Sequence, residues 1–273
     1  MKINNQTVSL ETAAQVSRVI VNADGSSLKA MDTIVREHFL DIYVNERLVG
    51  KVVCTPSHLE ELVLGRLLTE GVIGGTGEVE SLYICEQGHT AKVFLREDVS
   101  VSWQQEVVQE PTCCTGNQSL LQRVKWGDGA ESADECVVNV RKLPKAYWQP
   151  AWIFALANVF ADGSKIHQKT KGTHSAYLGS KGECVFAAED IGRHNALDKC
   201  IGYMLLQGLT PADCILFTTG RVPTDMVQKA VMAGVPVLAS KAVPTDAAVE
   251  LAKECGLTLI CKAWPDRMEV YAQ

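Results

Sequence analysis

Short apolar strands alternate with helices of roughly eleven residues through the second half of the chain, and this alternation restricts the possible folds most strongly. The predicted strands are 214–219, 236–239 and 257–262, and the predicted helices are 195–207, 223–233 and 245–255. Strands that repeat with helices between them pair in parallel, and the helices then cover the faces of the sheet. The pattern therefore predicts a three-layer α/β domain.

Three further elements are predicted in the same half. Apolar residues at 151–162 predict a helix that Gly163 ends, and the runs 174–179 and 183–188 predict a hairpin. The last run, 268–271, is typical of an edge strand.

The first half has a weaker pattern. Residues 1–30 are polar with little periodicity, and at most an early strand is expected there. Alternating apolar residues between 34 and 53, with Asn45-Glu46 in the middle, predict a hairpin. Ser57-His58-Leu59-Glu60 has the form of a capping box, which predicts a helix from this point to about Glu70.

Weak alternation at 79–107 predicts more strands, and the stretch 143–150 is typical of a linker. We therefore expect a smaller N-terminal α+β domain at 1–145 and the α/β domain at 146–273.

The formal net charge of −6 gives no basic field that could hold a nucleic-acid backbone. No apolar stretch is long enough to cross a bilayer, and the first residues lack the apolar block of a secretory signal. We therefore expect a cytoplasmic protein that binds neither nucleic acid nor membrane.

Adjacent cysteines, Cys113-Cys114, lie in the stretch 109–119, which is rich in turn-forming residues and has no apolar period. We expect an exposed, mobile loop there. A sulfur carrier needs such a thiolate, because it must attack a bound sulfur, hold it as a persulfide and pass it on. The alternative is that both are incidental loop thiols. Adjacent cysteines lack the spacing of a zinc site, so no metal site is predicted.

Two strand-to-helix connections carry groups that suit an anion. Asp190 to Asn195 contains Arg193 and His194, and Thr218 to Arg221 contains Thr219, Gly220 and Arg221. Both should lie at the carboxyl ends of sheet strands, where open α/β sheets bind ligands. The alternative for the first connection is a capped turn, in which Asn195 is the N-cap and Asp190 pairs with Arg193.

A third candidate segment follows the last parallel strand. It consists of Lys262, Ala263, Trp264, Pro265, Asp266 and Arg267. Two cations and an indole suit a purine nucleotide with phosphates. The alternative is a surface turn whose Trp264 packs on a neighbouring helix.

Several of these segments together resemble the formate dehydrogenase accessory (FdhD) family. The similar segments are EDIGRHNALDK at 189–199, HSAYL at 174–178, the stretch 218–260, and the N-terminal block 43–73. The resemblance covers most of the chain from about residue 40.

The resemblance implies a sulfurtransferase-type carrier with a persulfide intermediate. It would take sulfur from a cysteine desulfurase and pass it to the molybdenum bis(molybdopterin guanine dinucleotide) cofactor for formate dehydrogenase. It also implies a cytidine-deaminase-like C-terminal domain, a homodimer, transient cofactor binding at 262–267, and GDP as a partial mimic of that cofactor.

One departure from the family concerns its C-G-x-C-G loop, where this chain has Thr112-Cys113-Cys114-Thr115-Gly116-Asn117. Cys113 best matches the first family cysteine, which carries the persulfide. The second family cysteine is replaced by Cys114, which is adjacent to Cys113. Which of the two cysteines carries the sulfur therefore stays open.

Two other classes of function remain as alternatives. A zinc deaminase or related hydrolase would need a P-C-x-x-C segment as well as an H-x-E segment, and the sequence contains no P-C-x-x-C segment. A non-catalytic nucleotide-binding or cofactor-binding adaptor would not depend on Cys113, so a sulfur-transfer assay separates it from a carrier.

Overall fold

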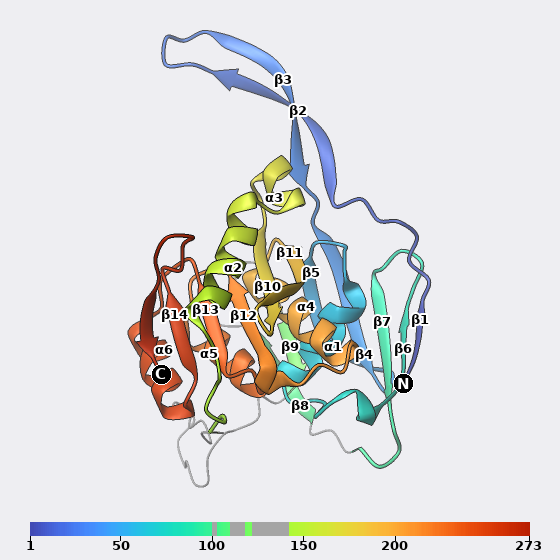
Figure 1. The fold of residues 1–273 in the computed structure, drawn as a ribbon. Coiled ribbons are helices and arrows are strands. Elements are labelled where there is room, and N and C mark those ends of the chain that lie inside the picture. Colours follow the sequence, from blue (N-terminus) through green and yellow to red (C-terminus); the bar gives the residue numbers. More distant parts are fainter. Residues whose placement is uncertain (100–102, 110–117, 122–141) are drawn as a thin grey trace.

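A computed structural model describes residues 1–99, 103–109, 118–121 and 142–273 (Figure 1). Cys113 and Cys114 lie outside the described residues, as does most of the predicted loop at 109–119. Whether that loop is exposed and mobile therefore stays a prediction.

The first half of the chain forms one large sheet, called here the first sheet. In the described residues its strand order is β1-β6-β7-β4-β5-β9-β8. The strands are β1 (Lys2–Asn5), β4 (His38–Val44), β5 (Arg47–Cys54), β6 (Val79–Ile84), β7 (Thr90–Leu95), β8 (Trp103–Gln109) and β9 (Gln118–Leu121). The predicted hairpin is confirmed, because Asn45 and Glu46 turn between β4 and β5 with φ values of 46° and 65°.

The polar N-terminal stretch folds into more strand than its sequence indicates. β2 (Ala13–Val21) and β3 (Ser27–Val35) pair with each other as an antiparallel ribbon that projects from the body (Figure 1). Its tip turns at Gly25, whose φ is 83°. The ribbon was missed because neither strand has a buried face, and periodicity detects strands through burial.

The second half forms the second sheet, with strand order β11-β10-β12-β13-β14-β15 in the described residues. Its strands are β10 (His174–Ser180), β11 (Glu183–Asp190), β12 (Cys214–Thr218), β13 (Val237–Ser240), β14 (Thr258–Cys261) and β15 (Glu269–Ala272). The predicted hairpin, the parallel arrangement of β12, β13 and β14, and the edge strand at the C-terminal end are all confirmed.

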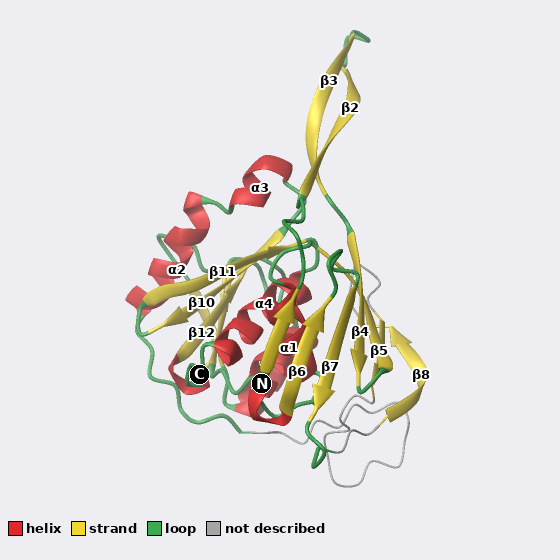
Figure 2. Ribbon diagram, turned by 90° about the vertical axis from the view of Figure 1, so that its right-hand side faces the viewer, coloured by secondary structure: helices red, strands yellow, loops and turns green. Residues whose placement is uncertain are grey.

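The helices are α1 (Leu59–Thr69), α2 (Pro150–Asp162), α3 (Lys165–Thr170), α4 (Arg193–Leu206), α5 (Thr224–Met232) and α6 (Asp246–Cys255). Helices α1 and α4 lie between the two sheets, and α2 covers the opposite face of the second sheet (Figure 2). One hydrophobic core runs from Leu40 in the first sheet through α1 and α4 to Leu216 in the second. The fold is thus mixed α/β, as expected.

The predicted capping box is wrong, although its helix is confirmed. The N-cap of α1 is His58, not Ser57, and His58 has a left-handed backbone with φ 53° and no side-chain cap hydrogen bond. The amide of Ser57 donates to the carbonyl of Thr55 at 2.8 Å, so this segment turns tightly before the helix begins.

The capped-turn alternative for 190–195 is also wrong. Helix α4 begins at Arg193 with Gly192 as its N-cap, so Asn195 lies inside the helix. The Asp190 carboxylate accepts hydrogen bonds from Lys199 Nζ at 2.6 Å and from Asn195 Nδ2 at 2.9 Å. It also accepts the amides of Gly192 at 2.9 Å and of Thr55 at 3.0 Å.

This buried network ties the start of α4 to the first half of the chain. Lys199 Nζ also donates to the carbonyls of Thr55 and Glu189, each at 3.1 Å, and Asn195 Nδ2 donates to the carbonyl of Val53 at 2.8 Å. The side chains of Lys199 and Asp190 are both 0% exposed. Each charge is therefore stable in the core only because the other is present and fully hydrogen-bonded.

Two glycines set the approach of α1 to α4. A Cβ built on Gly202 of α4 would overlap the carbonyl of Glu61, and a Cβ built on Gly65 of α1 would overlap the carbonyl of Asp198. The two helix backbones therefore touch directly, which only glycine allows.

We predict that Gly202→Ala lowers the free energy of unfolding by about 3 kcal/mol or more, because the new methyl group forces the helices apart. Alanine's higher helix propensity, about 1 kcal/mol, is too small to offset this cost. Gly77→Ala is the control, since a Cβ there meets nothing within 4 Å. Urea unfolding should find the control close to the unsubstituted protein; equal stability of both variants would contradict the close contact.

We predict that Asp190→Asn destabilises the protein by about 3–5 kcal/mol, because it leaves the Lys199 ammonium in the core without its counter-charge. Glu250→Gln is the matched control, since it removes the acid of an exposed ion pair with Lys253 and should change stability by less than about 1 kcal/mol. A small effect of Asp190→Asn in the same urea titration would mean that the network contributes little.

Candidate functional site

The candidate site lies at the carboxyl ends of β12, β13 and β14, where open α/β sheets bind ligands. Three loops follow these strands and are held side by side by backbone hydrogen bonds. The amide of Lys241 donates to the carbonyl of Thr218 at 3.2 Å, and the amide of Ala263 donates to that of Ser240 at 2.9 Å. The structure thus brings the predicted segments 219–221 and 262–267 to one edge of the second sheet.

Arg193 joins this edge from the start of α4. Its side chain packs against Gly220, where a Cβ would lie 2.9 Å from Arg193 Cδ. The carbonyl of Gly220 accepts a hydrogen bond from Ser240 Oγ at 2.7 Å, which fixes the loop. Thr219 Oγ1 accepts the amide of Ser175 at 3.0 Å, so this hydroxyl ties the loop to β10.

His194 and Arg221 occupy very different environments. The His194 side chain is 3% exposed, and its Nε2 lies 3.0 Å from Asp225 Oδ2 in α5. The imidazole therefore fixes α5 to α4 and is not open to a ligand. Arg221, in contrast, is exposed at the edge of the site.

The segment 262–267 is a tight turn at the surface. The amide of Trp264 donates to the carbonyl of Arg267 at 2.7 Å, and Ala263 is buried whereas Trp264, Pro265, Asp266 and Arg267 are exposed. Lys262 Nζ bonds to Glu269 Oε2 at 2.9 Å, and hydrogen bonds to Glu269 and Tyr271 raise its pKa.

An aromatic and cationic group lies beside this turn. Trp264 contacts Phe160 of α2 edge to face, with ring centroids 6.0 Å apart. Lys241 Nζ lies 4.7 Å from the centroid of Phe160 and 5.8 Å from that of Trp264. Trp264 does pack on a helix, as the surface-turn alternative states, but it remains 39% exposed, so part of its ring is open to a ligand.

Lys241 and His174 belong to the site but were missed in the sequence. Lys241 directly follows β13, so its place after a predicted strand was an available signal. His174 opens β10, whose antiparallel direction puts its first residue at the ligand edge. Burial lowers the pKa of His174, and Arg193, His167, Lys241 and His194 lower it further. A locally positive environment of this kind suits an anion.

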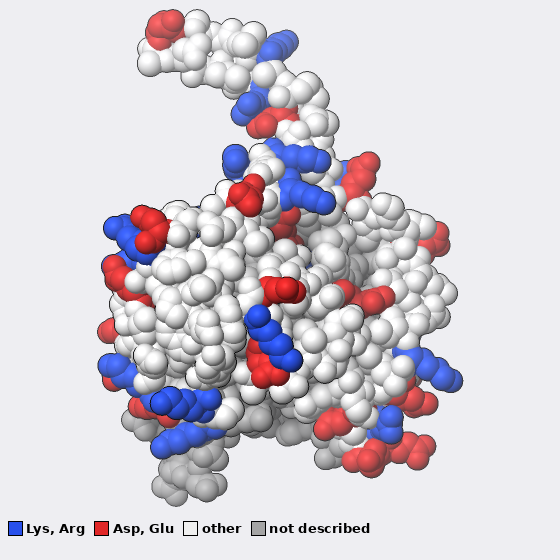
Figure 3. Space-filling view, in the orientation of Figure 1, with Lys and Arg blue, Asp and Glu red and all other residues white. Residues whose placement is uncertain are grey.

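The charge distribution over the molecular surface differs from the locally positive environment of the candidate site. Figure 3 shows acidic and basic side chains interspersed over the face drawn, without a broad surface of one sign. The positive character of the site therefore depends on a few residues at the edge of the second sheet.

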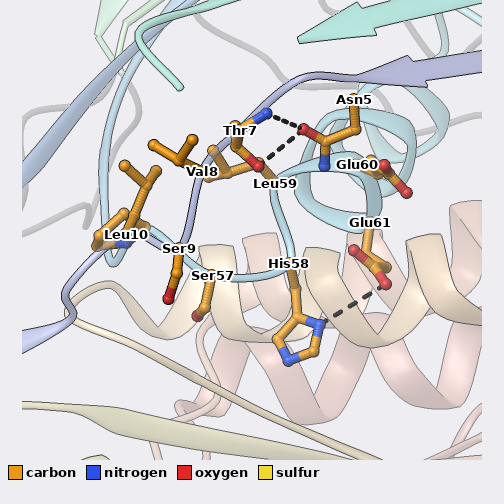
Figure 4. Close-up of a pocket in the computed structure, with 11 residues that line it drawn as sticks. Asn5, Thr7, Val8, Ser9, Leu10, Ser57, His58, Leu59, Glu60 and Glu61 are labelled. Carbon is orange, nitrogen blue, oxygen red and sulfur yellow. Dashed lines mark hydrogen bonds and ion pairs between the residues drawn. The ribbon is translucent and has the colours of Figure 1, made fainter. Parts of the chain in front are cut away.

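A separate pocket of about 310 Å³ lies at the start of α1, lined by residues 5, 7–10 and 56–61 (Figure 4). His58 Nδ1 lies 3.6 Å from Glu61 Oε1 in its wall. Burial raises the pKa of Glu61, but the interaction with His58, a backbone hydrogen bond and the charge of Lys199 together outweigh it, so the pKa is lowered. Among the residues that the structure describes, none of the predicted site residues lines this pocket.

Six of the seven described cysteines are poor candidates for sulfur chemistry, and Cys85 is the exception. Cys214 and Cys261 are buried, as their apolar surroundings indicate, whereas Cys85 and Cys184 are partly exposed. Burial raises the pKa of Cys214 to about 11 and that of Cys261 to about 12. It also raises the pKa of Cys54, Cys184, Cys200 and Cys255.

Two absences hold for the described part of the chain. No group of three or more histidine, cysteine or acidic side chains there is arranged to hold a metal ion. No helix in the same residues has the length and apolar character needed to span a bilayer.

Comparisons with known proteins agree on one family. The sequence profile of the FdhD/NarQ family matches residues 35–273. The "Sulfur carrier protein FdhD" of Listeria innocua serovar 6a is 31% identical over 248 residues, covering 91% of this chain and 92% of that protein. The protein of the same name from Halalkalibacterium halodurans is 32% identical, covering 94% and 93% of the two chains.

A solved structure has the same fold. The crystal structure of a protein from Desulfotalea psychrophila, described as a candidate formate dehydrogenase accessory protein, superimposes with a TM-score of 0.75. It covers 96% of this chain and 98% of its own, at 23% sequence identity. The family match, the relatives and the shared fold lead to the same conclusion: this chain belongs to the FdhD/NarQ family.

Proposed function

We propose that the chain is a sulfur carrier that takes persulfide sulfur from a cysteine desulfurase. It passes this sulfur to the molybdenum bis(molybdopterin guanine dinucleotide) cofactor for formate dehydrogenase maturation. The observation that carries the proposal is the match, over more than 90% of both chains, to relatives named sulfur carrier proteins. Cytoplasmic location and a homodimer belong to the same proposal.

Cys113 is the proposed carrier, with Cys114 as its helper. Partial support comes from elimination, because burial raises the thiol pKa of six of the seven described cysteines, and a thiol must ionise to act as a nucleophile. The cysteines that remain are Cys85, Cys113, Cys114 and Cys136. In the sequence both proposed residues fall between β8 and β9.

The transfer would occur in two displacements. The Cys113 thiolate attacks the outer sulfur of the desulfurase persulfide, and the desulfurase thiolate leaves. For release, the Cys114 thiolate attacks Cys113 Sγ, so a Cys113–Cys114 disulfide forms and hydrosulfide leaves toward the cofactor. A disulfide between adjacent cysteines strains the backbone and is easily reduced, so it would be transient.

The edge of the second sheet is the proposed site for the guanine dinucleotide part of the cofactor. Arg221 and Lys241 offer cations to its phosphates, and the buried Arg193 adds positive charge at the start of α4. The exposed face of Trp264 offers a stacking surface to guanine. His194, Thr219, Gly220 and the remaining residues of 262–267 would shape this site. The bound cofactor supplies the molybdenum that receives the sulfur, and the chain's own residues hold and orient it.

The finer fold description also belongs to the proposal. We infer a C-terminal domain at 146–273 with cytidine-deaminase-like layering, and a smaller α+β domain at 1–145. A deaminase-like hydrolase is less well supported than a carrier, because the P-C-x-x-C segment that supplies its zinc ligands is missing from the sequence. A cofactor-binding adaptor without sulfur chemistry remains the second candidate, and the first prediction below separates it from a carrier.

We predict that Cys113→Ala abolishes activation of formate dehydrogenase in a reconstituted assay with desulfurase and cofactor, because no persulfide can form at the carrier position. Cys114→Ala should reduce activation less, since it removes only the thiol that assists release. Folding and nucleotide binding should be unchanged in both variants. Full activation by Cys113→Ala would favour the adaptor, and a large loss of stability would mean that the cysteines are structural.

We predict that GDP binds the protein in calorimetry and that ATP binds more weakly, because the site is proposed to recognise a guanine dinucleotide. Arg221→Ala should weaken GDP binding about tenfold through loss of a charged contact to phosphate. Arg18→Ala, on the projecting ribbon, is the matched control and should bind GDP normally. Absence of GDP binding, or indifference to Arg221→Ala, would count against the proposed site.

A further inference from the structure

His174 is placed at the ligand edge by the register of β10. Ala176 pairs with Thr218 of the antiparallel strand β12, so His174 lies two residues further on, beside the Gly220 loop. On its other side His174 pairs with Asp190, at the end of β11. The residue therefore stands between the two connections that carry Arg193 and Gly220.

The direction of its side chain follows from the pleat of the sheet. Residues directly opposite each other in an antiparallel pair point to the same face. Asp190, the partner of His174, points to the α4 face, where it bonds to Lys199. Ala176 belongs to the core on that face as well. The imidazole of His174 is therefore directed toward the start of α4.

Two cations and two further histidines surround this imidazole. Arg193 and His194 approach from α4, His167 from α3, and Lys241 from the loop after β13. The acids on β11 are already bound: Asp190 to Lys199, and Glu189 to the amides of Ile166 at 2.9 Å and His167 at 2.6 Å. His194 is matched by Asp225 of α5.

The His174 ring itself is half-buried and makes no hydrogen bond to the residues that the structure describes. Burial, and then the four basic groups, lower its pKa, so the ring is neutral at pH 7. An anion placed among these cations would reverse their effect on the ring, because its negative charge favours the protonated form.

We propose that His174 is an anion-binding residue that contacts a phosphate of the bound nucleotide and takes up a proton when the nucleotide binds. This inference rests on the nucleotide site of the proposed function. It adds His174 to the residues of that site and couples nucleotide binding to the uptake of one proton. The contribution of His174 to affinity then grows as the pH falls from 8 to 6, because protonating the ring becomes easier over that range.

The test is calorimetry of GDP binding at pH 6 and pH 8, in pairs of buffers with different ionisation enthalpies, so that proton uptake is measured directly. His174→Gln keeps a polar, neutral side chain and removes the titrating ring. GDP also exchanges protons through its terminal phosphate, so the difference between variant and unsubstituted protein isolates His174. We expect the variant to take up fewer protons and to bind about tenfold more weakly at pH 6, with a smaller difference at pH 8.

His89→Gln is the control, because His89 is an exposed histidine of the first sheet, and it should reproduce the proton uptake of the unsubstituted protein. Circular dichroism confirms that each variant is folded. If His174→Gln binds GDP with unchanged affinity and proton uptake, the role of His174 is overturned while the nucleotide site stands. If the unsubstituted protein does not bind GDP, the proposed nucleotide site and the role of His174 are both contradicted.

Discussion

The direct contact between helices α1 and α4 determines how the two halves of the molecule fit together. Gly65 and Gly202 let the helix backbones meet without side chains between them, so each sheet packs on a shared helical layer. Besides the pair of Asp190 and Lys199, a second buried ion pair lies beside this helix contact. Lys229 of α5 bonds to Asp198 of α4 at 2.8 Å and to Thr69 Oγ1 of α1 at 2.9 Å. Stability of the second sheet thus depends on residues of the first half.

The same contact positions the candidate site. Helix α4 begins beside the candidate site. Buried hydrogen bonds among Asp190, Lys199 and the backbone of Thr55 fix the start of the helix. Arg193 is the first residue beyond this network and reaches the Gly220 loop. A rigid, buried set of charges therefore supports Arg193, which is itself buried, behind the exposed Arg221 that would meet a phosphate. This is expected for a site whose geometry must be set before the ligand arrives.

Periodicity predicted the second half of the fold almost entirely, because its strands and helices each bury an apolar face. Periodicity gave wrong predictions where a local structure depends on a contact with residues far away in the sequence. Nothing near Ser57 shows that His58 would adopt a left-handed conformation, and nothing near Asp190 shows that Lys199 and Thr55 would be its partners. The loops with Arg193, Gly220 and Trp264 were predicted from their place after strands. His174 was missed because it stands before one.

The mass of the intact protein shows directly whether the chain itself carries sulfur. After incubation with a cysteine desulfurase and cysteine, the account predicts a species heavier by one sulfur atom, which peptide analysis locates at Cys113 and which a reductant removes. The Cys113→Ala variant should lack this species. No added sulfur on the unsubstituted chain, or sulfur found instead on a described cysteine such as Cys85, would contradict the account.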